Sequence, residues 1–452
     1  MATEELNIVA IELGSSKVIG VAGTKRLDGK IEIKAHEMQD ASTFIRKGMI
    51  LNADLATSCI QNIKAKLEEK LQKKINQVYV SYSGQGVHSV HNEVVRSFSE
   101  EEHKILKEDI DSIYDENINY TYEGHRILDA IPQEFTVGTQ KLFDAVGVMS
   151  NNIEGRYLNI IAKSKLLNFV ENCFKNVSGV RVAEYKLTPL VVADQLLNEA
   201  QKNSGCLLVD IGADTTTVSI YKSKLLRFLS VIPLGSENIT KDIMSLQLEH
   251  TDAEELKVSK FGEPYASFTE EEGESVVKTT SDGIEIKRKT LSAVIDARLT
   301  EILINVKQQI NESKYARDSL IAGAFLTGGG ANMANIANVF KEVVGIDKVT
   351  IRKNSQSADY ILPPGIKNTE TRYLAALGLI AGANQNCTTD LEASKTDIFE
   401  TEKPVEPAPE PEQIPEPEPE ETPKEKHKKK GKSLFSRLGK KIAEWGTKIT
   451  DE

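Results

Sequence analysis

Apolar residues in the first 387 positions follow two periods, one of about two residues and one of three to four. The shorter period, in runs rich in Val, Ile and Leu, predicts strands. Such runs lie at 7–13, 17–23, 77–83, 205–212, 215–221, 225–235 and 321–330. The longer period predicts amphipathic helices at 53–74, 299–313 and 331–344. Because strands and helices alternate along the chain, we expect an α/β architecture.

Two of the predicted strand pairs resemble each other. One begins at Val9 (VAIELGSSKVIGVAG) and the other at Leu208 (LVDIGADTTTVSIY). In each, an apolar strand is followed by an acid, an apolar residue and a glycine, and small hydroxyl residues then lead into a second strand. An internal repeat of this kind predicts two related domains that face each other.

The repeated turn contains residues that suit a phosphate group. Gly14 and Gly212 permit tight turns in which backbone N–H groups converge on one point and can bind phosphate oxygens. The side chains that can add hydroxyl donors are Ser15, Ser16, Thr215 and Thr216. The acids Glu12 and Asp210 can hold Mg²⁺, directly or through water. Either hairpin alone is more simply an ordinary β-hairpin, but the pair favours a polyphosphate held from two sides.

A third glycine-rich segment completes the pattern. Gly328, Gly329 and Gly330 stand between a predicted buried strand and a predicted helix, where they permit close approach of a planar ligand. We call the two similar strand pairs, around Gly14 and Gly212, the first and second phosphate hairpins. A lone glycine triplet is weak evidence, but two such hairpins followed by a glycine turn form a specific order. This order resembles the actin/Hsp70/sugar-kinase ATPase superfamily, and within it the FtsA family of actin-like bacterial cell division proteins.

The resemblance covers nearly the whole chain. The segments that carry it are 46–56 (RKGMILNADLA), 77–87 (QVYVSYSGQGV), 125–138 (HRILDAIPQEFTVG), 231–243 (VIPLGSENITKDI), 252–262 (DAEELKVSKFG), 291–303 (LSAVIDARLTEIL) and 371–382 (TRYLAALGLIAG). It implies an actin-like ATPase fold, in which two related domains surround a nucleotide cleft and carry an inserted small α+β subdomain. It also implies ATP and Mg²⁺ as cofactors.

The resemblance further implies boundaries and site residues. The implied subdomains are IA at 5–83 and 163–198, the inserted 1C at 84–162, IIA at 199–243 and 318–387, and IIB at 244–317. The implied ATP-binding residues are Gly14, Ser15, Ser16, Lys17, Asp210, Gly212, Asp214, Thr215, Thr216, Gly235, Glu254, Lys257, Gly328, Gly329 and Gly330, with Glu12 and Asp210 as metal ligands. Lys17 is also explained as the start of the next strand. Glu254 and Lys257, which share a helical face, are equally explained as a solvated surface pair.

Four residues depart from the superfamily pattern. Glu12 replaces the usual Asp of the first hairpin, a change that FtsA-like sequences tolerate. Ala213 and Asp214 replace two glycines of the second hairpin, which adds bulk and a negative charge near the expected phosphate. Thr188 stands where related ATPases often place Glu or Gln to orient the attacking water, and a threonine hydroxyl is a poor general base. We therefore expect ATP binding with weak or no ATPase activity, and no catalytic residue is assigned.

Composition narrows the class of protein. The 452 residues carry a formal net charge of −11, which argues against nucleic acid as the main partner. The four cysteines are far apart, so neither a zinc site nor a disulfide framework is expected and a reducing compartment is indicated. The acidic N-terminus does not resemble a secretory signal, and no apolar run approaches the length of a spanning helix.

The end of the chain changes composition twice. Residues 388–423 contain twelve acids and two lysines, a net charge of −10, and eight of the fourteen prolines. Proline and like charges favour an extended backbone, so we predict a linker at 388–427. Residues 424–452 contain ten bases and four acids, a net charge of +6. We predict a membrane-targeting helix at 428–452.

On a helical wheel, the apolar residues of this tail share one face and its cations lie outside it. The predicted membrane-binding residues are Leu434, Phe435, Arg437, Leu438, Lys440, Lys441, Ile442, Trp445, Lys448 and Ile449. This pattern is typical of a helix that lies in an anionic membrane surface, with Trp445, the only tryptophan, at interfacial depth. The alternative is a helix that docks on the protein's own body, and the long charged linker argues against it.

The resemblance implies partners and a location. FtsA-like proteins tether the tubulin-like GTPase FtsZ through its C-terminal peptide, and Arg298 and Glu301 are candidates for the contact face. Being three residues apart on a helix, they could equally form an internal ion pair. Self-association into filaments, later division proteins and the cytoplasmic face of the membrane at the division site are also implied. An actin-like pilus-assembly adaptor is the main alternative; a small-molecule kinase and a chaperone-like ATPase fit less well.

Overall fold

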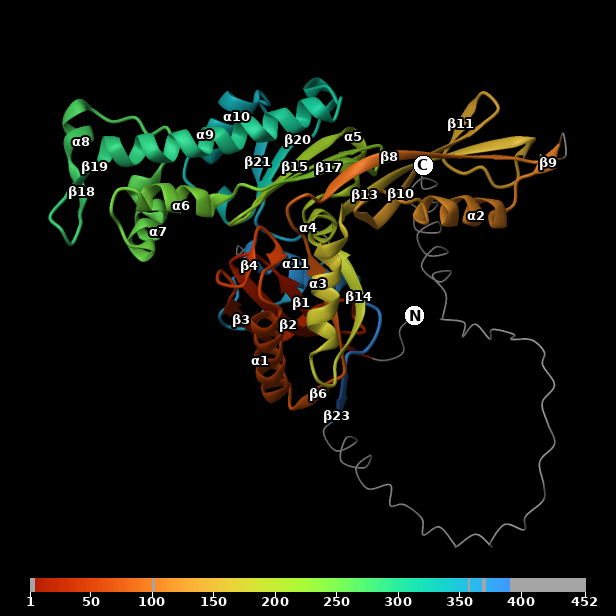
Figure 1. The fold of residues 1–452 in the computed structure, drawn as a ribbon, viewed down its shortest axis with the longest axis horizontal. Helices are drawn as coiled ribbons and strands as arrows, with labels where there is room; N and C mark the ends of the chain where they lie inside the picture. Colours follow the sequence, from red (N-terminus) through yellow and green to blue (C-terminus); the bar gives the residue numbers. More distant parts are fainter. Residues whose placement is uncertain (1–4, 100–101, 357, 368–370, 391–452) are drawn as a thin grey trace, which may run out of the picture. The chain divides into compact units, whose positions relative to one another are not determined.

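The computed structural model describes residues 5–390, apart from 100–101, 357 and 368–370. Two large β-sheets organise these residues, and helices pack on both of them (Figure 1). This arrangement confirms the expected α/β architecture. The tail predicted at 428–452, with all its membrane-binding residues, and most of the predicted linker lie outside the described residues.

The first sheet contains the first phosphate hairpin. In the described part of the chain it has six strands in the order β14-β7-β1-β2-β3-β22. Their bounds are β1 Leu6–Leu13, β2 Lys17–Lys25, β3 Ile31–Asp40, β7 Gln77–Tyr82, β14 Arg181–Leu187 and β22 Tyr360–Ile361. The helices that pack with them are α1 (Ala53–Leu71), α3 (Ser164–Lys175), α4 (Thr188–Leu196) and α11 (Leu374–Gly382).

Helix α1 shows how the apolar period becomes packing. The Asn52 side chain accepts a hydrogen bond from the Leu55 N–H at 3.0 Å and so caps the first turn. The side chains that α1 buries are Ala56, Cys59, Ile60, Ile63 and Leu67, spaced three or four residues apart. The helix ends earlier than the predicted residue 74 because Gln72 has a φ of 53° and Lys73–Ile75 forms strand β6, which pairs with β23 (Thr388–Asp390).

The second sheet contains the second phosphate hairpin. Among the described residues it has nine strands in the order β11-β10-β13-β8-β17-β16-β15-β20-β21. Their bounds are β8 His88–Ser97, β10 His125–Val137, β11 Gln140–Leu142, β13 Asn152–Lys163, β15 Cys206–Ile211, β16 Thr216–Lys222, β17 Leu225–Ile232, β20 Gly323–Thr327 and β21 Val349–Ile351. The helices of this part are α6 (Ser236–Met244), α7 (His250–Val258), α9 (Arg288–Glu312) and α10 (Ile336–Val344).

The segment between β7 and α3 interrupts the first sheet in the sequence but extends the second sheet in space. Its strands β8, β13 and β10 continue the sheet beyond β17 (Figure 1). The junction is narrow: Ser230 is the β17 residue that pairs in register with β8. Side chains reinforce it, because Gln133 donates to the Leu226 carbonyl at 3.2 Å and accepts from Arg227 at 2.9 Å. The inserted segment therefore connects both halves of the protein.

The helix predicted at 331–344 begins later than expected. Gly330–Asn332 forms a short 3₁₀ turn, and Asn335 has a φ of 57°, so α10 begins only at Ile336. A left-handed residue cannot continue an α-helix, and the sequence pattern did not reveal it. The helix predicted at 299–313 is the C-terminal part of the longer α9.

The other described elements are short. They are β4 Ile45–Arg46, β5 Met49–Ile50, β9 His103–Lys104, β12 Met149–Ser150, β18 Val276–Thr279, β19 Glu285–Lys287, α2 Lys107–Ile118, α5 Glu199–Ser204 and α8 Glu270–Glu274, with 3₁₀ turns at Lys260–Gly262, Arg317–Ser319 and Thr371–Tyr373. Within the ranges that the structure describes, every helix is too short or too polar to cross a bilayer.

Candidate nucleotide-binding site

The two phosphate hairpins fold into the same turn. The Gly14 N–H donates to the Lys17 carbonyl at 3.0 Å, and the Gly212 N–H donates to the Thr215 carbonyl at 2.8 Å. A Cβ atom on Gly14 would lie 2.8 Å from its partner oxygen, and one on Gly212 would lie 3.0 Å away. Both turns therefore favour glycine because the backbone approaches itself closely. The repeat in the sequence is a repeat of backbone geometry.

Helix α6 begins directly on the second hairpin. The Ser236 N–H and hydroxyl both donate to the Gly212 carbonyl, at 2.9 and 3.1 Å, and the Glu237 N–H donates to the Ala213 carbonyl at 2.8 Å. Gly235 permits this contact, because a Cβ atom there would lie 2.3 Å from the Ala213 carbonyl oxygen. Gly235 therefore supports the hairpin by packing, and it is not among the residues that line the cleft.

Both hairpins face one cleft of about 1290 Å³. The predicted residues that line it are Glu12, Gly14, Ser15, Ser16, Lys17, Asp210, Gly212, Asp214, Thr215, Glu254, Lys257, Gly328, Gly329 and Gly330. Thr216 does not line it, because its hydroxyl donates to the Leu234 carbonyl at 2.9 Å. Thr217 lines the cleft in its place, since successive side chains of a strand point to opposite faces.

The two predicted metal ligands are buried carboxyl groups. Oε2 of Glu12 is buried and has no hydrogen-bond partner within the described residues. Burial, together with the charge of Asp210, raises the pKa of Glu12 to about 8, although a hydrogen bond from the Ala376 backbone opposes the shift. Burial also raises the pKa of Asp210 to about 6. Among the residues that the structure describes, no positively charged side chain lowers the pKa of either acid.

This pair fits Mg²⁺ held together with a nucleotide. Among the described residues, no group of three or more His, Cys, Asp and Glu side chains could hold a metal by itself. Mg²⁺ usually takes one or two carboxylates and completes its shell with phosphate oxygens and water. Glu12 offers an unpaired buried carboxylate oxygen near Asp210, and both acids line the cleft beside the two phosphate turns. Together these groups suit such an ion.

The glycine triplet packs against Asp210 and leaves space in the cleft. Gly328 has a φ of 87°, and a Cβ atom there would lie 2.3 Å from Oδ1 of Asp210. A Cβ atom on Gly330 would lie 2.4 Å from the Ile211 side chain. Gly329 is different, because a Cβ atom there would meet nothing within 4 Å. Two glycines of the triplet are therefore required by packing against the β15 segment, and the middle one lies against open space.

Asp214 has a partner that the sequence did not suggest. Its Oδ2 accepts a hydrogen bond from the Lys47 backbone N–H at 2.9 Å. The Gly48 N–H likewise donates to Oγ of Ser15 at 2.9 Å. Strands β4 and β5 form the hairpin that carries these two amides, so it contacts both phosphate hairpins. The N–H dipole of Lys47 therefore offsets part of the negative charge of Asp214.

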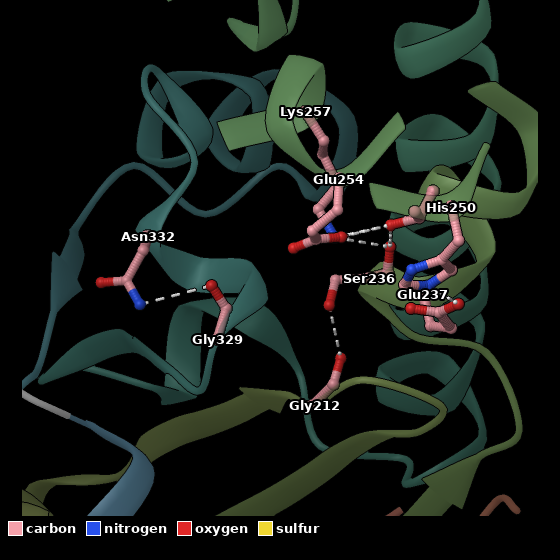
Figure 2. A network of polar contacts seen from close by, with 9 residues as sticks. Gly212, Ser236, Glu237, His250, Glu254, Lys257, Gly329 and Asn332 are labelled. Carbon is pink, nitrogen blue, oxygen red and sulfur yellow. Dashed lines mark hydrogen bonds and ion pairs between the residues drawn. The ribbon is translucent and has the colours of Figure 1, made fainter. Parts of the chain in front are cut away.

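Glu254 and Lys257 belong to a network of polar contacts in the lining of the cleft (Figure 2). The Lys257 ammonium lies 2.5 Å from Oε2 of Glu254 and 2.7 Å from Oγ1 of Thr240. The Thr240 hydroxyl donates to the same Glu254 oxygen at 2.7 Å. Lys257 is buried, and its ion pair holds the pKa of Glu254 below its usual value although burial opposes this shift. Both residues line the cleft, with Lys257 buried and the Glu254 side chain 41% exposed.

Several cleft residues were not assigned from the sequence. Asn332 lies beside the glycine triplet, where its side-chain amide donates to the Gly329 carbonyl at 3.3 Å (Figure 2). Others in the lining are Arg46, Gly48, Ser83 and Ser236. Arg46 and Gly48 lie in the segment RKGMILNADLA, which supported the family resemblance but had no chemistry attached to it. Thr188 lines the cleft, which is where a residue that orients the attacking water would have to lie.

The candidate partner residues Arg298 and Glu301 lie on α9, away from the cleft lining. Arg298 donates to both carboxylate oxygens of Asp242, at 2.5 and 3.1 Å, and also pairs with Glu301. The internal ion pair considered from the sequence is therefore present. Glu301 remains half exposed, so contact with a partner stays a prediction.

Two family models match the chain. The model of "Cell division protein FtsA" matches residues 207–400, and that of the "SHS2 domain inserted in FTSA" matches residues 84–161. Together they match more than half of the chain.

Curated relatives agree with these models. The chain is 28% identical over 384 residues to a cell division protein FtsA of Porphyromonas gingivalis, covering 84% of this chain and 78% of the relative. It is 28% identical over 391 residues to the FtsA of Neisseria meningitidis, covering 85% and 91%. It is also 28% identical over 359 residues to the FtsA of Escherichia coli, covering 74% and 81%.

A solved structure shares the fold. A chain of the "PilM-PilN type IV pilus biogenesis complex" aligns with a TM-score of 0.56 and 15% identity, covering 82% of this chain and 97% of the other. At this identity the likeness concerns the fold alone, and it agrees with the two-domain actin-like arrangement expected from the sequence.

Proposed function

The chain belongs to the FtsA family of cell division proteins, and we propose that it binds ATP with Mg²⁺ and anchors FtsZ to the cytoplasmic membrane. In this proposal the actin-like body binds nucleotide, self-associates into filaments and contacts the C-terminal peptide of FtsZ. The tail at 428–452 binds the membrane surface, and the assembled protein helps to recruit later division proteins.

One observation carries the nucleotide part of the proposal. Two identical glycine turns, each preceded by a buried acid, line one cleft. Backbone amides at such turns bind phosphate oxygens without a charged side chain. Glu12 and Asp210 would hold Mg²⁺, which neutralises phosphate charge when bound. The wall formed by Glu254, Lys257 and the glycine triplet would receive the nucleoside.

Hydrolysis is proposed to be slow. Thr188 lies in the cleft at the first turn of α4, and its hydroxyl cannot take a proton from water at neutral pH as a carboxylate or imidazole could. We therefore propose that the protein uses nucleotide binding mainly to set its conformation and its contacts with neighbouring copies.

The tail supplies the membrane part of the proposal. Its apolar stripe and surrounding cations suit a helix that lies in an anionic surface. The linker is acidic, so an anionic membrane would repel it, and its prolines would favour an extended backbone. Such a tether would let the body reach a filament that lies some distance from the lipid.

The test is reconstitution on vesicles that contain about 30% anionic lipid. The full chain should carry FtsZ to the vesicles in a co-sedimentation assay, whereas FtsZ alone and FtsZ lacking its C-terminal peptide should stay in solution. A chain that ends at residue 423 should bind FtsZ but should not bring it down with lipid. Sedimentation of FtsZ with this truncated chain would contradict the role of the tail.

The alternatives are not proposed. A pilus-assembly adaptor shares the fold, but the family matches are to cell division proteins. A kinase would need a carboxylate placed to accept a proton from a substrate hydroxyl, and no kinase-type motif supplies one.

A further inference from the structure

We propose that Arg46 binds the terminal phosphate of the nucleotide. This assignment rests on the proposed function, in that it requires the cleft to bind ATP. Arg46 belongs to neither phosphate hairpin, and Lys17, the nearest residue predicted to bind ATP, lies 29 positions before it in the sequence. The contacts of the β4–β5 hairpin bring it to the site.

The β4–β5 hairpin has a tight and defined turn. Arg46 pairs with Met49, so Lys47 and Gly48 form a two-residue loop. Both loop residues have positive φ, 51° and 74°, which is the conformation of a type I′ turn. A lysine is uncommon in this region of backbone space, so other contacts must hold the turn in place.

Those contacts come from both phosphate hairpins. The Gly48 N–H donates to Ser15 of the first hairpin, and the Lys47 N–H donates to Asp214 of the second, each at 2.9 Å. On the other side, the Lys47 carbonyl accepts from the Gln85 N–H at 2.8 Å. A Cβ atom on Gly48 would lie 2.1 Å from the Ser83 carbonyl oxygen, so the backbones are in close contact. The backbone next to Arg46 is therefore fixed relative to both phosphate turns.

The Arg46 side chain is available for a ligand. It is exposed and lines the cleft, and within the described residues it has neither a hydrogen bond nor an ion pair with another side chain. Lys47, its neighbour, is not among the lining residues. The acids Glu12, Asp210 and Asp214 also line the cleft, so a cation beside them would reduce the repulsion of a polyphosphate.

Arginine suits this role for a chemical reason. Its guanidinium is always charged, and its planar array of donors matches two oxygens of one phosphate. Because the hairpin backbone is already fixed, only the side chain has to become ordered when the ligand binds. The opposing interpretation is an exposed arginine that only solvates the rim of the cleft.

The test compares Arg46→Gln with the matched control Lys47→Gln in the full chain. Affinities for ATP, ADP and AMP are measured by calorimetry with Mg²⁺ present, and thermal melts confirm that both variants fold. Arg46→Gln should weaken ATP by about ten- to a hundred-fold, ADP by less and AMP hardly at all, because a charge-assisted phosphate contact is lost. Lys47→Gln should keep wild-type affinities, and Arg46→Lys should recover part of the ATP affinity.

The outcomes separate this assignment from the proposed function. If the wild-type protein binds ATP and both glutamine variants bind it equally well, Arg46 does not contact phosphate. An equal loss of ATP, ADP and AMP in Arg46→Gln would also overturn the assignment, since it would indicate a change in the whole cleft. If the wild-type protein binds none of the three nucleotides, the proposed ATP function fails, and the assignment fails with it.

Discussion

At the scale of single residues, the site is defined by two carboxyl groups that the fold buries together. Glu12 and Asp210 end equivalent strands, and burial raises the pKa of each. A protein that bound no cation here would gain nothing from keeping two acids in this place, because their ionised forms are costly. Their presence is explained if Mg²⁺ and a nucleotide complete the site.

Glu12→Gln should stabilise the protein when Mg²⁺ and nucleotide are absent. The folded-state pKa of about 8 lies above the ordinary value of 4.5, so wild-type stability falls as the pH rises from about 4.5 to 8, and an uncharged amide does not titrate. We expect a gain of about 1–3 kcal/mol in the free energy of unfolding at pH 8 and a smaller difference at pH 5, measured by urea unfolding in EDTA. The same variant should weaken Mg²⁺-dependent ATP binding. A variant that is less stable at pH 8 would contradict this account.

Thr188→Ala should leave the rate of ATP hydrolysis within about twofold of wild type. A threonine hydroxyl contributes little as a base, so its removal should cost little, and the wild-type rate should itself lie far below the roughly 10 s⁻¹ of a typical enzyme. Phosphate release under saturating ATP measures both rates. Rapid turnover that Thr188→Ala abolishes would show that the hydroxyl is needed for catalysis.

At the scale of elements, hairpins and glycine turns bring the site together by close backbone contact. The first hairpin lies in one sheet and the second in the other, and the β4–β5 hairpin contacts both through two backbone amides. The glycine triplet then packs on the strand that carries Asp210. At Gly48 and Gly328 the neighbouring atoms leave no room for a side chain.

Gly328→Ala should destabilise the protein, whereas Gly329→Ala should leave its stability almost unchanged. At Gly328 the φ is 87° and a Cβ atom would overlap Asp210, so alanine should destabilise the fold by about 2 kcal/mol or more. At Gly329 nothing lies within 4 Å, so alanine should change the free energy of unfolding by less than about 0.5 kcal/mol. Chemical unfolding measures both values.

Because Gly329→Ala adds a methyl group to the cleft without disturbing the fold, it should weaken nucleotide binding. Tight ATP binding by this variant would mean that the nucleotide does not approach the triplet. Equal stability losses in the two variants would contradict the packing described for Gly328.

At the scale of the whole molecule, the inserted segment links the two large sheets that carry the candidate nucleotide-binding site. The inserted segment leaves the first sheet after Tyr82 and joins the second sheet through β8 and β17, so it contacts both halves. Its first residues also contact the β4–β5 hairpin, through Gln85. A short series of backbone contacts therefore joins the phosphate turns to the inserted segment.

Trp445→Glu should abolish binding of the full chain to anionic vesicles and leave ATP affinity unchanged. A carboxylate cannot enter the apolar layer, and the anionic surface repels it. Trp445→Phe is the matched control and should retain most of the binding, because it keeps an apolar ring at that depth. Vesicle flotation and calorimetry provide the two readouts. Retained flotation of Trp445→Glu would contradict the membrane role of the tail.

Local pattern was sufficient to predict much of this protein. The strand pairs around Gly14 and Gly212 were visible because alternation and turn residues are short-range properties, and their similarity indicated two related domains. The family resemblance, now confirmed, followed from the order of these motifs. The predicted subdomain boundaries, the membrane role of the tail and the FtsZ face at Arg298 and Glu301 remain predictions.

Other features depended on contacts between distant parts of the chain. The left-handed conformation of Asn335 and the burial of Lys257 follow from how each segment packs, and no local pattern encodes them. Arg46 belongs to the segment 46–56, which supported the family resemblance, but the sequence assigned no role to it. The sequence by itself determined the strands of the two phosphate hairpins, their repeat and the residue types of the site. Only the tertiary structure decided which residues share the cleft. The β4–β5 hairpin contacts both phosphate turns through backbone N–H groups, and because every residue type except proline has such a group, the sequence does not mark these contacts.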